Sequence, residues 1–234
     1  MSTRGNGETF MPTILITGAN RGIGLESARQ FSADGWRVLA CSRNPEAATE
    51  LSSLSGVTVH ALDVTDIASV DRLAQQIADP IDVLLNNAGQ SPRPSLEFGS
   101  MDYDGWADLF AVNTLAPFKM IEAFHDHLRR SDRRVVANVS SLMGSIADTS
   151  SGIVPYRTTK AALNMVTKAL SGSLAGDKIV VFSIHPGWVR TDMGGPSATV
   201  SPQDSAAGIK EVIEGANADA SGQFFNWTGE TLPW

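Results

Sequence analysis

The stretch TILITGANRGIG, residues 13–24, joins a short β-branched strand to a glycine-rich turn, and apolar residues at helical spacing follow from Gly22 to Asp34. Glycines in such a turn let the backbone bend sharply and approach a pyrophosphate, whose charge the N-terminus of the next helix stabilises. The spacing here is G-x-x-x-G-x-G rather than G-x-G-x-x-G. A strand, a glycine turn and a helix in this order predict a dinucleotide-binding α/β fold, with a turn that holds no ligand as the alternative.

Apolar runs alternate with amphipathic stretches along the rest of the chain. We expect strands at residues 13–16, 37–40, 57–62, 83–85, 134–139, 179–184 and 223–225. We expect helices at residues 22–34, 45–54, 67–78, 103–130, 156–174 and 202–214. Short continuous apolar strands separated by helices are typical of a parallel sheet covered on both faces. The sequence therefore predicts a single-domain, Rossmann-type, doubly wound parallel sheet of seven strands over residues 11–234, after a flexible N-terminal arm at residues 1–10.

The composition limits the classes of partner. Among 234 residues there are 18 Lys and Arg against 25 Asp and Glu, a net charge of −7, and no run of basic residues, which disfavours a nucleic-acid or anionic-membrane partner. No segment approaches the roughly 18 consecutive apolar residues of a membrane span, and the polar N-terminus lacks the apolar core of a signal peptide. We therefore expect a cytoplasmic protein. The histidines lack the spacing of metal ligands and Cys41 is the single cysteine, so we expect neither a metal nor a disulfide.

Tyr156 and Lys160 lie four residues apart at the start of the helix expected at residues 156–174. Such positions share one face of a helix, with Cβ atoms roughly 5–6 Å apart. An ammonium that close favours the phenolate, so we expect the pKa of Tyr156 to lie below its usual value of about 10. A phenol that ionises more easily is a usable proton donor and acceptor. Such a pair is common on helix surfaces, but downstream of a dinucleotide-type turn in the sequence it predicts a catalytic proton donor.

The charge at the end of the second strand bears on the choice of dinucleotide. In dinucleotide-binding folds an acid at this place binds the ribose 2′-OH of NAD, whereas an arginine accommodates the 2′-phosphate of NADP. Here the strand ends in Ser42 and Arg43, and Arg21 inside the glycine turn adds a second cation. Bidentate arginine–phosphate pairing suits this task, so we expect NADP(H). The alternative is that both arginines are solvated surface residues.

Six elements in chain order resemble the short-chain dehydrogenase/reductase family, and the resemblance covers about residues 12 to 230. They are the turn at residues 17–24, the Asn-Asn-Ala-Gly run at residues 86–89, Asn113, Ser141, the Tyr156/Lys160 pair and Pro186-Gly187. The segment at residues 222–234, together with the short stretch after Pro186, resembles the compact C-factor/sniffer-type carbonyl reductase branch.

The resemblance implies a catalytic set of Asn113, Ser141, Tyr156 and Lys160. Ser140 and Ser141 both end a strand, and consecutive strand side chains face opposite ways. The family pattern Ser-x-x-Gly, met at residues 141–144, selects Ser141 and leaves Ser140 a structural role. Tyr156 would protonate the substrate oxygen, Lys160 would lower the pKa of Tyr156 and hold the nicotinamide ribose, and Asn113 would support a proton-relay water.

The turn and the resemblance together imply a set of cofactor contacts along the carboxyl ends of the strands. In the family pattern Asp63 binds the adenine amino group, although an aspartate that closes a turn or caps a helix is the alternative. Val189 and Thr191 would contact the nicotinamide carboxamide. The expected positions are Gly18, Asn20, Arg21, Gly22, Ile23, Gly24, Ser42, Arg43, Asp63, Val64, Asn87, Ala88, Gly89, Tyr156, Lys160, Pro186, Gly187, Val189 and Thr191.

We therefore expect an NADPH-dependent oxidoreductase, a carbonyl reductase that transfers hydride between nicotinamide and a carbonyl or alcohol substrate. Ser141 and Tyr156 are the expected substrate contacts, and Trp188 either walls the substrate or merely packs. The alternatives are a dinucleotide-binding signalling or sensor protein with little turnover, and an epimerase or dehydratase on the same fold. We expect a lid from residues 90–101 and 192–200, and a homodimer or homotetramer formed through the helix faces at residues 103–130 and 156–174.

Overall fold

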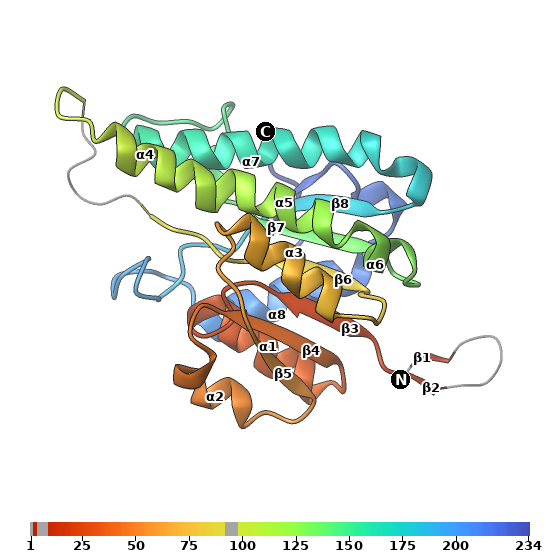
Figure 1. Cartoon of the computed structure of the whole chain (residues 1–234). Coiled ribbons are helices and arrows are strands. Elements are labelled where there is room, and N and C mark those ends of the chain that lie inside the picture. Colours follow the sequence, from red (N-terminus) through yellow and green to blue (C-terminus); the bar gives the residue numbers. More distant parts are fainter. Residues whose placement is uncertain (1, 4–8, 92–97) are drawn as a thin grey trace.

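The structure is a computed structural model that describes residues 2–3, 9–91 and 98–234 (Figure 1). Its main feature is a sheet of seven strands in the order β5-β4-β3-β6-β7-β8-β9, with every neighbouring pair parallel. The strands are β3 (Thr13–Ile16), β4 (Arg37–Ser42), β5 (Val57–Ala61), β6 (Val83–Asn86), β7 (Val135–Val139), β8 (Val180–His185) and β9 (Phe224–Asn226). The expected seven-stranded parallel sheet is confirmed.

Helices cover both faces of this sheet (Figure 1). One face carries α1 (Gly22–Ala33), α2 (Thr49–Ser52) and α8 (Pro202–Gly215). The other carries α3 (Ile67–Gln76), α5 (Ala116–Ala123), α6 (His125–Arg129) and α7 (Val154–Ser173), with α4 (Tyr103–Phe110) packed against α7. Short turns complete the chain: η1 (Pro45–Ala47), η2 (Ala111–Leu115), η3 (Leu142–Gly144), η4 (Ala175–Asp177) and η5 (Ala218–Ala220).

The pleat of the strands sends successive apolar side chains into two separate cores. Ile14 and Ile16 face the core that contains Phe31 of α1 and Ile209 of α8. Leu15, between them, faces the core under α3, α5 and α7. This alternation is the reason that continuous apolar runs, rather than runs with every second residue polar, marked the strands in the sequence.

The N-terminal segment contains a short element that the sequence did not predict. Ser2–Thr3 (β1) and Thr9–Phe10 (β2) pair antiparallel as a two-stranded sheet. The expected flexible arm also includes residues 1 and 4–8, which lie outside the described residues, and its flexibility stays a prediction. None of the helices in the described parts of the chain has the length and apolar character needed to cross a bilayer.

The helix expected at residues 103–130 is interrupted, so the expectation of one continuous helix is wrong. After α4 the chain makes one π turn, η2, before α5 begins. Pro117 has no N–H to offer the carbonyl of Asn113, and a proline ring clashes with the carbonyl four residues before it. Asn113 lies at the centre of this turn, and such π turns are frequent at functional sites. A second break at Phe124 separates α5 from α6.

Phe31 tests the core between α1 and the sheet. It is fully buried and its ring packs edge-on against Trp36, with ring centres 4.9 Å apart. We expect Phe31→Ala to lower the free energy of unfolding by about 3–5 kcal/mol, because it removes buried contacts and leaves a cavity. Urea denaturation followed by circular dichroism measures this loss. Ile67→Ala, at the exposed start of α3, is the control and should change stability by no more than about 0.5 kcal/mol.

Candidate active site

A cleft of about 1250 Å³ lies along the carboxyl ends of the central strands. Its lining draws on the glycine turn after β3, the ends of β4, β6 and β7, the start of α7 and the loop after β8. Most of the expected cofactor positions line it, namely Gly18, Asn20, Arg21, Gly22, Ile23, Ser42, Arg43, Asp63, Val64, Asn87, Ala88, Gly89, Tyr156, Lys160, Pro186 and Thr191. Gly24, Gly187 and Val189 do not line it, and each lies within or directly beside a segment that does.

Hydrogen bonds from the end of β6 hold the glycine turn in shape. The Asn87 amide donates to the Thr17 carbonyl at 2.9 Å and to the Gly18 carbonyl at 3.0 Å, and Thr17 Oγ1 accepts the Asn87 and Ala88 N–H groups, both at 3.0 Å. A Cβ on Gly24 would lie 2.4 Å from the Gly18 carbonyl oxygen. Asn87 and Gly24 therefore fix the conformation of the turn. The side-chain amide of Asn87 donates both of its hydrogen bonds to the backbone of the turn.

The first turn of α1 fits an anionic group. Its N-cap, Arg21, makes no side-chain hydrogen bond to the free N–H groups of the helix, and the surrounding turn lines the cleft. Unsatisfied N–H groups at a helix N-terminus, together with the helix dipole, attract phosphate. The residues present therefore fit the pyrophosphate of a dinucleotide.

Three of the four expected catalytic side chains come together at the start of α7. The Ser141 side chain is hydrogen-bonded to Tyr156, and it also accepts the N–H of Met143 at 3.1 Å. Lys160 is 3% exposed, and its Nζ donates to the Val139 carbonyl at 2.9 Å. The same Nζ lies 5.8 Å from the centre of the Tyr156 ring. The end of β7 and the first turns of α7 thus bring the serine, the phenol and the amine into one place.

Burial dominates the proton affinities of these groups. It raises the pKa of Tyr156 to about 12, although the hydrogen bond from Ser141 acts in the opposite direction. Burial also lowers the pKa of Lys160 to about 8. Removal from water disfavours the charged form of each group, phenolate and ammonium alike. The expectation that Lys160 holds the pKa of Tyr156 below its usual value is therefore wrong for this structure.

The loop after β6 holds Asn113 beside Tyr156 and Lys160. Asn113 Oδ1 accepts the N–H of Gln90 at 2.8 Å, and its Nδ2 donates to the Gln90 carbonyl at 2.9 Å and to Thr159 Oγ1 at 3.1 Å. Gly89 lies between Asn113 and Lys160, since a Cβ there would be 3.5 Å from Asn113 Oδ1 and 3.7 Å from Lys160 Nζ. The Asn113 amide therefore ties the cleft wall to α7, and its support of a relay water stays a prediction.

The charged residues expected to choose the cofactor line the cleft. Arg43 follows β4 on the cleft wall and lies close enough to Asp63 to help lower the pKa of that carboxyl, after the larger effect of hydrogen bonds from Thr65. Asp63 Oδ1 accepts the N–H and the hydroxyl of Thr65, so this aspartate closes a turn, as the alternative had it. Arg21 forms an exposed ion pair with Asp192 across the cleft. The phosphate role of Arg21 and the adenine role of Asp63 stay predictions.

The loop after β8 forms the rim next to Thr191. Its two arms are joined where Val200 donates to the Trp188 carbonyl and accepts the N–H of Arg190, both at 2.9 Å. Trp188 is 54% exposed, its ring nitrogen donates to the Gly194 carbonyl at 2.9 Å, and its side chain does not line the cleft. Its contact with substrate stays a prediction. The other half of the expected lid includes residues 92–97, which lie outside the described residues.

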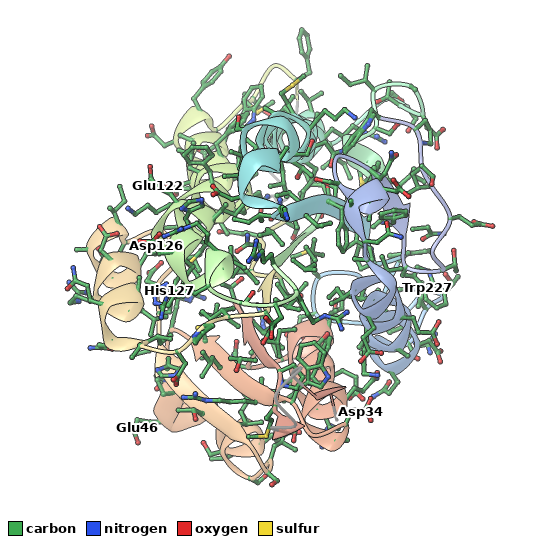
Figure 2. The ribbon with its side chains drawn as sticks, turned by 90° about the vertical axis from the view of Figure 1, so that its right-hand side faces the viewer. Asp34, Glu46, Glu122, Asp126, His127 and Trp227 are labelled. Atoms are coloured by element: carbon green, nitrogen blue, oxygen red, sulfur yellow. The ribbon has the colours of Figure 1, made fainter. Side chains whose placement is uncertain are left out.

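The histidines have structural surroundings. His127 lies between α6 and the end of α3 (Figure 2), where its Nε2 is hydrogen-bonded to the Ile77 carbonyl at 2.7 Å. Burial lowers the pKa of His185, at the end of β8, to about 4. In the part of the chain that the structure describes, no three His, Cys, Asp or Glu side chains gather as metal ligands would.

Comparison with known families agrees with this geometry. A family profile described as short chain dehydrogenase matches residues 12–200, most of the chain. The chain belongs to the short-chain dehydrogenase/reductase family. The C-signal protein of Myxococcus xanthus is 44% identical over 156 residues, which cover 66% of this chain and 93% of that protein.

Solved structures of this family have the same fold. The carbonyl reductase Sniffer of D. melanogaster is 32% identical, with a TM-score of 0.90 over 96% of this chain and all of that chain. The NADPH-bound carbonyl reductase from chicken fatty liver is 30% identical, with a TM-score of 0.88 over 97% of this chain and all of that chain. The expected resemblance to the sniffer-type branch is confirmed.

Several residues that position the site were missed in the sequence. The loop between Ser141 and Tyr156 is fastened from one side by the Trp234 oxygen, which accepts hydrogen bonds from Ser145 Oγ, Ile146 N and Ala147 N at 3.1, 2.6 and 3.2 Å. From the other side Arg157 donates to the carbonyls of Met143 and Gly152 and to the Ser150 hydroxyl. No local pattern predicts the contact of Trp234 with a loop that precedes it by almost 90 residues. Asn164 was also missed, although it shares a helix face with Lys160 four residues earlier.

The lowered pKa of Lys160 makes a prediction about stability. Between pH 8 and about 10.5 the unfolded lysine binds more protons than the folded one, so the free energy of unfolding should rise with pH across this window. Compared with Lys160→Met, the wild type should gain up to about 3 kcal/mol from the lower to the upper pH. Urea denaturation at fixed pH, without added dinucleotide, measures the difference. Lys178→Met, at an exposed turn, controls for loss of a lysine charge, and parallel curves for wild type and Lys160→Met would contradict the burial argument.

Proposed function

We propose that this protein is an NADP(H)-dependent carbonyl reductase that interconverts a small carbonyl compound and its alcohol. The observation that carries the proposal is the hydrogen-bonded Ser141–Tyr156 pair beside buried Lys160, at the carboxyl edge of a sheet whose first turn fits a dinucleotide. A protein that only binds a dinucleotide needs no serine beside a phenol that lines the cleft. The likeness to carbonyl reductases at 30% and 32% identity supports the same activity.

The cleft favours NADP(H) over NAD(H). β4 ends at Ser42, Arg43 follows it where an acid would select the ribose 2′-OH, and both residues line the cleft. A guanidinium pairs well with a phosphate through two parallel hydrogen bonds. The chicken-liver relative, bound to NADPH, is consistent with this choice.

The chemistry is divided between cofactor and protein. Bound NADPH supplies the hydride. Ser141 donates a hydrogen bond to the substrate oxygen, and Tyr156 donates its proton to that oxygen as negative charge develops there. The high pKa of Tyr156 keeps the phenol protonated at neutral pH, which is the form a reduction requires. Lys160, whose pKa of about 8 leaves it mostly protonated at neutral pH, stabilises the phenolate that the proton transfer leaves behind. Each group acts where charge appears in the transition state.

A second candidate function rests on the likeness to the C-signal of Myxococcus xanthus, at 44% identity. On this reading the protein is a signalling or sensor protein that binds a dinucleotide with little turnover. An epimerase or dehydratase would regenerate its cofactor in each cycle. Measuring NADPH consumption across a panel of aldehydes and ketones separates the reductase from both alternatives, because only a reductase consumes NADPH in proportion to product. Homo-oligomerisation and a cytoplasmic location remain expectations from the sequence.

Tyr156 should be indispensable for turnover. We expect Tyr156→Phe to fold and to bind NADPH, yet to lose about 10²- to 10⁴-fold in kcat, because it lacks the proton donor. Steady-state rates with the best substrate of the panel and fluorescence titration with NADPH measure the two effects. The matched control is Tyr103→Phe, since the chain has two tyrosines and Tyr103 is exposed at the start of α4. A Tyr156→Phe enzyme with near-parental rates would remove the phenol from the mechanism.

Arg43 should set the cofactor preference. Replacing its guanidinium in Arg43→Asp should weaken NADPH binding about 10- to 100-fold and improve NADH binding, because a charged hydrogen bond to phosphate is lost and an acceptor for the 2′-OH is gained. The ratio of kcat/KM for NADPH and NADH measures the change. Arg129→Asp on α6, away from the cleft lining, is the control. An unchanged ratio in Arg43→Asp would show that the phosphate lies elsewhere.

A further inference from the structure

One buried side chain connects both sides of Ser141 to α7. Asn164 Oδ1 accepts a hydrogen bond from Ser140 Oγ at 2.6 Å, and Asn164 Nδ2 donates to the Gly144 carbonyl at 3.3 Å. Ser140 directly precedes Ser141, and Gly144 ends the η3 turn that follows it. Asn164 is 4% exposed and lies one helical turn after Lys160. Its amide therefore fastens the short segment that carries the serine to the helix that carries Tyr156.

The surroundings make this link specific to the site. Ser140 Oγ also lies 3.5 Å from the Lys160 carbonyl oxygen, and a Cβ on Gly144 would lie 2.7 Å from the Lys160 carbonyl carbon. The segment thus lies directly on the backbone of α7. The contact between Gly144 and α7 holds the segment close but leaves it able to slide along the helix. A hydrogen bond at each end of the segment removes that freedom, because hydrogen bonds are directional.

Packing alone does not explain an asparagine here. Burying an amide costs free energy unless it is hydrogen-bonded, and an apolar side chain of similar size would fill the same space without that cost. The two partners of Asn164 are on opposite sides of Ser141, and neither helps to close α7 on itself. The presence of an amide here is therefore best explained by the segment around Ser141 that it binds.

We propose that Asn164 is a positioning residue that keeps the Ser141 hydroxyl within hydrogen-bond reach of the Tyr156 hydroxyl. This inference rests on the proposed reductase function, which it extends from the reacting groups to the residue that sets their separation. Because two reacting groups must be aligned closely, loss of the amide reduces the rate of the chemical step while leaving dinucleotide binding intact.

A double-mutant cycle tests this role. Asn164→Ala should lower kcat about 10- to 100-fold and leave the KM for NADPH within about twofold, since a misplacement near 1 Å is enough to cost that much. In a Ser141→Ala background the same substitution should have little further effect, because the hydroxyl that it positions is absent. A general loss of stability would lower kcat in both backgrounds alike. Equal effects in both backgrounds would overturn the proposal.

Two further variants separate positioning from folding. Ser140→Ala removes the hydroxyl that donates to Asn164 while every residue of α7 stays unchanged. It should reproduce part of the loss in kcat. Thr167→Val is the matched control, because Thr167 is a fully buried polar residue of the same helix whose hydroxyl bonds to Asn138 and Ser183 instead. We expect Thr167→Val to lower stability but to retain kcat. A loss in Thr167→Val as large as that in Asn164→Ala would also count against the proposal.

A spectroscopic measurement keeps the test independent of turnover. With two tyrosines in the chain, the carbon-13 resonance of the Tyr156 Cζ can be assigned by comparison with Tyr156→Phe. Ser141→Ala should shift this resonance at neutral pH, because the hydrogen bond to the phenol is lost, and Asn164→Ala should shift it in the same direction. An unchanged chemical shift of this resonance in folded Asn164→Ala would contradict the positioning role. If the wild type consumed no NADPH, the proposed function would fail, and this measurement would still decide the role of Asn164.

Discussion

The contact between Gly144 and the backbone of Lys160 is the constraint on which the site depends. A Cβ on Gly144 would lie 2.7 Å from the Lys160 carbonyl carbon, so any other residue would push the η3 turn away from α7. Ser141 lies three residues before this contact, and Tyr156 lies one helical turn before Lys160 on the other side of it. This contact between two backbones sets how closely the segment that carries the serine lies on α7, and the hydrogen bonds of Asn164 fix its position along the helix. The bond from Lys160 Nζ to the Val139 carbonyl fastens the same helix to the end of β7.

Burial of the phenol and of the amine governs the electrostatics of the site. At 5.8 Å from the Tyr156 ring centre, an ammonium would favour the phenolate, yet burial penalises both charges and outweighs that attraction in this structure. With pKa values of about 12 and about 8, the phenol is protonated at neutral pH and the amine is mostly protonated as well. This state suits the proposed reduction, in which the phenol begins protonated and loses its proton only as the substrate oxygen gains charge. In the proposed reduction the Ser141 hydroxyl would donate to the phenol and then to the substrate, which is why its placement would matter.

The sequence predicted what depends on local pattern. The seven strands, most helices and the cleft residues of the glycine turn follow from apolar runs and from glycines directly after a strand. The interruption at η2 was missed because the periodicity of apolar residues continues through it, and only the relation between Pro117 and the Asn113 carbonyl breaks the helix. The anchors at Asn164 and Trp234 were missed because their partners lie 20 or more residues away in sequence. The prediction of a lowered pKa for Tyr156 was wrong because the spacing of two residues in the sequence carries no information about their burial.

The polar side chains on the inner face of α7 explain how the position of this helix along the sheet is fixed. Apolar side chains pack against a sheet in several neighbouring positions at similar cost, because the hydrophobic effect is non-directional. Along α7, Thr159, Lys160 and Asn164 instead form hydrogen bonds to Asn113, to the Val139 carbonyl and to Ser140. Sliding the helix by a fraction of a turn would break all of these bonds at once and leave buried polar groups unsatisfied, at about 1–3 kcal/mol each. The apolar core fixes that α7 lies on the sheet, and the buried polar contacts fix where along the sheet Tyr156 and Lys160 come to rest.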